Sequence, residues 1–320
     1  MEGRPLRAVG LAALLLVSLG ARSSTPNFVV ETADPQLCQQ IAQTAEKCRH
    51  DLAVEWLGQP MPNWSSPCVM TVQVGPRLGP GGATTFVFDR SEVFGWRMTI
   101  QGSAERVIDS VLPHEVTHMI LASYFRRPVP RWADEGAATT AEHNVEKQKH
   151  QKMLVEFLQT GRGISFSQMF AMTDYPPDVM PLYAQGFSLA EYLIELGGRP
   201  KFLRLLVDGM NDAQWSASVA RHYNIRDLAA LQNYWLSWVA QGRPRLQPPK
   251  SAPVLAGDAS GNLRPRPEPN LVLRQPKEFS VSSGPTPAPV NPGWYPGSTR
   301  PWKGGPTAAQ ATRPQPIQGP

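Results

Sequence analysis

Apolar side chains recur at helical spacing over residues 35–57 and then give way to alternating patterns. The helical positions are Leu37, Ile41, Ala45, Cys48, Leu52 and Trp56. Glycines and prolines from Gly58 to Pro67 break this helix. Three strand-like runs follow over 69–74, 84–88 and 96–101, and the first and last alternate as a half-buried sheet does. The stretch 79–82 lacks the Lys-Ser/Thr pair of a phosphate loop, which favours a turn there.

From Glu105 onward the periodicity is mostly helical as far as about residue 240. Strands followed by a run of helices predict one α+β domain over residues 24–242, with a small mixed sheet before a mainly helical half. The helices expected in this half cover 105–124, 131–159, 181–196, 199–209, 212–222 and 226–240.

The two ends of the chain differ from this domain. Arg4 and Arg7 precede the apolar run Val9–Leu19, and small residues follow, which predicts a signal peptide over residues 1–22 with cleavage near 20–23. A core helix or an uncleaved anchor is the alternative reading of this run. Export makes the expected location periplasmic, secreted or envelope-anchored.

The C-terminal segment carries the basic charge. Residues 241–320 hold 18 of the 33 prolines and a net charge of +7, although the whole chain carries only +5. Residues 243–320 are therefore predicted to be a disordered, basic, proline-rich tail, either a solvated linker or a contact with anionic cell-envelope polymer. Because the remainder is slightly acidic, the composition argues against a nucleic-acid-binding core.

Three cysteines leave one over if any two pair. Cys38 and Cys48 are too far apart along the expected helix, by about 15 Å, to bridge each other. Either a bridge from Cys68 to one of them or three unpaired buried thiols fits the sequence.

The most informative segment is Pro113-His114-Glu115-Val116-Thr117-His118. Two histidines four positions apart share one helix face, about 6 Å apart along the axis, so both imidazoles can reach one zinc ion. Glu115 lies beside that face, where a carboxylate can take a proton from a zinc-activated water and return it to the leaving amine. An amphipathic helix with two satisfied histidines is the alternative reading of this pattern.

A catalytic zinc needs a third protein ligand and one open position. Glu135, in the first turn of the helix expected from residue 131, is placed to point back toward the histidines, and Gly136 leaves room for close helix packing. Asp134 is a candidate either for orienting a ligand histidine or for a favourable charge at a helix start. His143, His150 and His222 are predicted to be ordinary polar residues.

The motif His114-Glu115-x-x-His118, followed after sixteen residues by Glu135-Gly136, resembles that of the gluzincin metallopeptidases, especially the peptidase-MA-like family. The resemblance implies a zincin-like fold, with Glu135 as the third zinc ligand. It also implies that Tyr183, in the Tyr-x-x-Gly pattern 183–186 of the helix expected over 181–196, hydrogen-bonds to the oxyanion of the tetrahedral intermediate. Gly186 would let this helix approach the site closely. The strand at 96–101 would edge the cleft and pair with an extended peptide substrate.

These features predict an exported zinc metallopeptidase that acts on a peptide or protein, with Glu115 as general base. The alternative is a non-catalytic, zinc-stabilised envelope protein that binds through its basic proline-rich tail. An intact Glu115 speaks against this alternative, because structural zinc prefers four closed ligands and needs no base. A zinc hydrolase for a non-peptide amide would carry the same residues.

Overall fold

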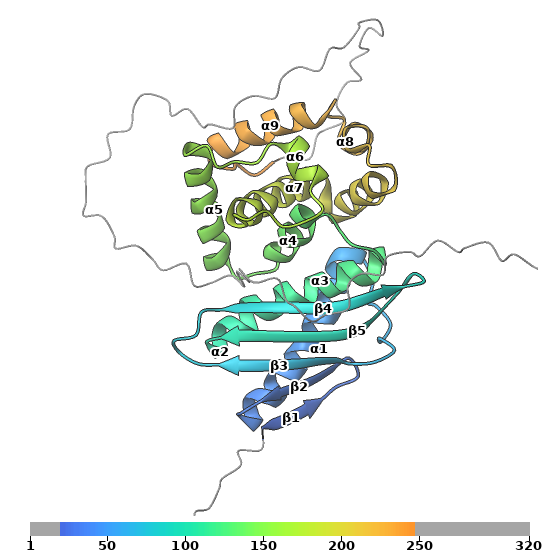
Figure 1. The fold of residues 1–320 in the computed structure, drawn as a ribbon, viewed down its shortest axis with the longest axis vertical. Helices are drawn as coiled ribbons and strands as arrows, with labels where there is room; N and C mark the ends of the chain where they lie inside the picture. Colours follow the sequence, from blue (N-terminus) through green and yellow to red (C-terminus); the bar gives the residue numbers. More distant parts are fainter. Residues whose placement is uncertain (1–19, 247–320) are drawn as a thin grey trace, which may run out of the picture.

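The computed structural model describes residues 20–246, which form a sheet in one half and a group of helices in the other (Figure 1). Most of the predicted signal peptide and the tail beyond residue 246 lie outside the described residues. The strands are β1 (Ala21–Ser24), β2 (Phe28–Thr32), β3 (Cys68–Val74), β4 (Gly81–Asp89) and β5 (Glu92–Gly102).

The helices follow the strands in the chain, except for α1, which lies between β2 and β3. Their bounds are α1 (Pro35–Leu57), α2 (Ala104–Arg106), the π-helical turn η1 (Val107–Val111), α3 (Leu112–Phe125), α4 (Arg131–Thr140), α5 (Asn144–Gln159), α6 (Phe166–Ala171), α7 (Met180–Asp212), α8 (Trp215–Tyr223) and α9 (Leu228–Ala240). The predicted α+β class, with a small mixed sheet and a mostly helical C-terminal half, is confirmed for these residues. None of the described helices is long and apolar enough to cross a membrane.

The sheet has the order β1-β2-β3-β5-β4, with β1 and β4 antiparallel to their neighbours and the other pairs parallel. One face is apolar and buried, as Met70, Met98 and Ile100 show, whereas Thr71 and Thr99 on the other face are exposed. Because α1 and α3 pack on the apolar face, the sheet places α3 between itself and the helical half (Figure 1).

Helix α1 ends where its sequence predicts. Asp34 caps its start by accepting hydrogen bonds from the amides of Gln36 and Leu37, and Gly58 ends it in the left-handed conformation. All three cysteines are free. Cys38 and Cys68 are buried and Cys48 is half-buried, which decides between the two readings of the cysteines in favour of unpaired thiols.

The helix predicted over 105–124 forms in three consecutive pieces, α2, η1 and α3. The amide of Leu112 donates to the carbonyl of Val107, a bond across five residues, which makes this turn π-helical. Pro113 follows directly and, because it has no amide hydrogen, cannot donate the hydrogen bond that an α-helix would make to the preceding turn. The wider turn therefore accommodates a proline immediately before the His-Glu-x-x-His segment.

The structure differs from the predicted elements in several places. The helix expected over 131–159 is interrupted between α4 and α5, where the His143 side chain caps the start of α5. Gly81 and Gly82, expected in a turn, begin β4, and β1, β2 and α6 were not predicted. The break between the helices at 181–196 and 199–209 is confirmed, because Gly198 adopts a non-helical φ of 74° inside α7.

The strand that the family resemblance placed at the cleft edge is not an edge strand. Strand β5, which contains residues 96–101, lies between β3 and β4, so β4 is the outer strand of the described sheet on that side. A tight turn at Arg90 and Ser91, both with positive φ, connects β4 to β5, so that the two strands pair antiparallel with β4 on the outer side. Any extended peptide that joins the sheet next to α3 would therefore pair with β4.

Helices α4 and α7 cross with their backbones in contact. A Cβ atom at Gly136 would lie 2.3 Å from the carbonyl oxygen of Gly186, and one at Gly186 would lie 2.5 Å from the carbonyl oxygen of Trp132. The close packing predicted for these two glycines is confirmed. This crossing fixes the part of α4 that carries Asp134 and Glu135.

Replacing Gly186 with alanine is expected to lower the free energy of unfolding by about 3 kcal/mol, because the added methyl group meets backbone atoms that no rotamer change can move. The matched control is Gly197→Ala in the same helix, where the Cβ meets the flexible Lys201 side chain. Denaturant unfolding of both variants measures the difference. Equal stability of the two variants would contradict the proposed tight crossing.

Candidate metal centre

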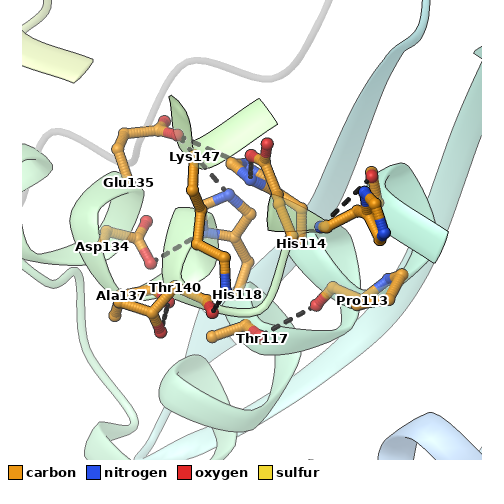
Figure 2. Close-up of polar contacts among 12 residues, drawn as sticks. Pro113, His114, Thr117, His118, Asp134, Glu135, Ala137, Thr140 and Lys147 are labelled. Carbon is orange, nitrogen blue, oxygen red and sulfur yellow. Dashed lines mark hydrogen bonds and ion pairs between the residues drawn. The ribbon is translucent and has the colours of Figure 1, made fainter. Parts of the chain in front are cut away.

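Two elements bring three side chains together at the predicted site. His114 and His118 extend from the same face of α3, and Glu135 extends from α4 toward them (Figure 2). The Nε2 atoms of His114 and His118 lie 3.5 and 3.7 Å from Glu135 Oε2, and the three ligand atoms all lie within 4.8 Å of one another. This cluster could hold a metal ion.

A carboxylate contacts the Nδ1 atom of each imidazole. His118 Nδ1 lies 2.8 Å from Asp134 Oδ1, and His114 Nδ1 lies 2.6 Å from Glu142 Oε1 (Figure 2 shows the Asp134 contact). A proton on each Nδ1 satisfies these contacts and leaves the Nε2 lone pair facing the cluster, which is the form that a metal ion needs. Asp134 thus orients a histidine, one of the two roles considered for it.

Burial and neighbouring charge set the ionisation of the cluster. Burial alone would lower the pKa of both histidines, but nearby carboxylates outweigh it, raising the pKa of His118 to about 9 and that of His114 well above 6.5. Burial would raise the pKa of Glu135, yet the same histidines hold it at about 2. Because a metal ion binds neutral imidazole, loading the site at neutral pH would release protons, and the affinity should rise with pH until both histidines are neutral.

Glu115 lies beside the cluster without joining it. Its side chain is buried, and its Oε2 accepts a hydrogen bond of 2.6 Å from Thr84 Oγ1 on β4. Burial raises the pKa of this carboxyl group, and both histidines oppose that rise. A Cβ atom at Gly82 would lie 2.4 Å from Glu115 Oε1, so glycine at this position of the edge strand makes room for the carboxylate.

Two tyrosines lie close to Glu135. The Tyr175 hydroxyl donates to Glu135 Oε1, whereas the two histidines lie near Oε2. The rings of Tyr175 and Tyr183 are stacked, with centroids 6.3 Å apart. Burial first, and then the charge of Glu135, raise the pKa of the Tyr183 phenol, so it stays protonated and can donate a hydrogen bond. The structure thus places Tyr183 near the cluster, next to a tyrosine that the sequence did not mark.

Sequence reasoning missed four residues of this region: Gly82, Thr84, Glu142 and Tyr175. Glu142 lies in the break between α4 and α5, two residues after α4 ends, so helical spacing from Glu135 does not predict its contact with His114. Gly82, Thr84 and Tyr175 had no sequence signal either, since their contacts depend on the tertiary placement of β4 and of the segment before α7. His222 bonds to Asp208 and His143 caps α5, in agreement with ordinary polar roles.

Comparison of the chain with protein-family models, with curated proteins and with solved structures gave no match.

Proposed function

We propose that this protein is a zinc-dependent metallopeptidase with a zincin-like fold. The observation that carries the proposal is Glu115, a buried carboxylate held by Thr84 next to a cluster that could hold a metal ion, yet not part of that cluster. A structural metal site does not require a carboxylate beside its ligands, whereas hydrolysis needs a general base next to the metal.

The donor set suits zinc. Two imidazole nitrogens and one carboxylate oxygen form the three-ligand set of hydrolytic zinc sites, which leave a fourth position open. Bonds of roughly 2.0–2.1 Å in tetrahedral geometry separate ligand atoms by about 3.3 Å, close to the 3.5 and 3.7 Å found between the imidazoles and Glu135. When bound, zinc would supply Lewis acidity that activates water and polarises a carbonyl group.

The protein groups divide the remaining work. Glu115 takes a proton from the attacking water and returns it to the leaving amine, while Thr84 holds its other oxygen in place. Tyr183 donates a hydrogen bond to the oxygen on which negative charge develops. Strand β4, as the outer strand beside Glu115, offers main-chain hydrogen bonds to an extended peptide. Export through the N-terminal segment belongs to the same proposal.

The purified full-length protein is expected to contain about one zinc per chain and to cleave members of a peptide library. Removing the metal with a chelator should abolish cleavage, and adding zinc should restore it. Metal analysis and mass spectrometry of the digest measure both effects. Cleavage that survives complete metal removal, or a zinc-loaded protein that cleaves no peptide, would contradict the proposal.

A further inference from the structure

A pocket of about 300 Å³ lies beside the metal centre, between β4 and the start of α4. His118 and Asp134 form the wall that it shares with the metal centre. The strand forms the opposite wall with residues 84–86 and Phe88. The pocket therefore borders one histidine of the cluster, His118, and also Thr84, which hydrogen-bonds to Glu115.

The alternation of β4 explains why one strand serves both places. Gly82 and Thr84 meet Glu115, and Phe86 and Phe88, further along the same side of the strand, line the pocket. A peptide extended along β4 at the metal centre would thus present a neighbouring side chain to the pocket. Phe86 is held in its wall by the Trp96 ring, 5.0 Å away between centroids.

The charges around the pocket are unbalanced. Arg127 and Arg131 both line it, whereas Asp134 is its one acidic residue and already bonds to His118. Arg127 is occupied, because its guanidinium donates to the carbonyls of Val207 and Met210 and to Asn211. Among residues 20–246, Arg131 has no carboxylate within ion-pair distance, and its guanidinium lies over the Tyr175 ring at 4.6 Å.

We propose that this pocket is a substrate subsite that selects an acidic side chain, glutamate or aspartate, next to the scissile bond, with Arg131 as the group that recognises the carboxylate. The inference rests on the proposed peptidase function. Apolar wall residues Ala122, Pro128 and Val129 take the methylene groups of such a side chain, while Arg131 pairs with its carboxylate. The pocket volume is large enough for a glutamate side chain with water.

The test compares peptides that differ only in this side chain, as Glu, Gln, Leu or Lys, with the zinc-loaded full-length protein. The Glu peptide is expected to have a kcat/KM about tenfold or more above that of the Gln peptide, the size of a charge-assisted hydrogen bond. Arg131→Gln should bring this ratio close to one, and Arg131→Glu should reverse it in favour of Lys. Arg126→Gln, which removes the same charge from an exposed neighbouring position outside the pocket, should keep the ratio.

A binding measurement separates this inference from the proposed function. Calorimetric titration of the Glu and Gln peptides into zinc-loaded Glu115→Gln protein should show the same preference, and Arg131→Gln should remove it. Cleavage at equal rates for Glu and Gln, or a preference for Leu over both, overturns the acidic subsite but leaves the peptidase standing. A protein that binds the Glu peptide selectively but cleaves no peptide supports the subsite and overturns the peptidase.

Discussion

Glu115→Gln should lower kcat by about 10²–10⁴-fold or more while zinc content stays unchanged. The glutamine amide cannot accept a proton from water, and Glu115 is the carboxylate that Thr84 of β4 holds beside the metal cluster. The isosteric side chain still accepts a hydrogen bond from Thr84, so the local packing persists. Steady-state kinetics beside metal analysis measures both quantities, and Glu156→Gln, at an exposed position of α5, is the control for charge.

Tyr183→Phe provides a contrast within the same experiment. It removes one hydrogen-bond donor, and kcat should fall by about 10²–10³-fold with little change in KM. Because Tyr175 is stacked against Tyr183, an unimpaired Tyr183→Phe enzyme would leave Tyr175 as the donor to examine. An active Glu115→Gln enzyme would refute the general-base mechanism itself.

Glu135→Ala should weaken zinc binding by more than about 100-fold, because it removes one of three ligands together with its negative charge. Glu142→Gln should weaken it by about 10–100-fold, since Glu142 only orients His114. Competition with a chromophoric chelator gives both dissociation constants. The loss of zinc affinity should be larger in Glu135→Ala than in Glu142→Gln. Full zinc affinity in Glu135→Ala would mean that another residue is the third ligand.

The sequence was sufficient for the parts of the site that lie on single helices. The spacing of His114, Glu115 and His118 on one helix fixes their relative directions, and the short connection to α4 limits where Glu135 can be. Local sequence patterns likewise predicted α1, β3 and the break at Gly198 within α7.

What the sequence could not give depends on strand order and on irregular backbone. A hairpin can leave either of its strands outermost, so periodicity alone could not show that β4 rather than β5 is the edge. Tyr175 reaches Glu135 from forty residues away, out of a segment with no regular structure. The interruption between α4 and α5 was not predicted, because the helical pattern of the sequence continues across it.

The crossing of α4 and α7 restricts how this chain can diverge. At both glycines the obstacle is a main-chain carbonyl, at Gly186 and at Trp132, rather than a side chain. No neighbouring side chain could become smaller to make room for a larger residue at either position. We therefore expect each glycine to be retained as long as the close crossing is retained, with no compensating substitution elsewhere. In distant relatives that keep this geometry, we expect glycine directly after the residue equivalent to Glu135 and again at position 186, even where the surrounding sequence has diverged strongly.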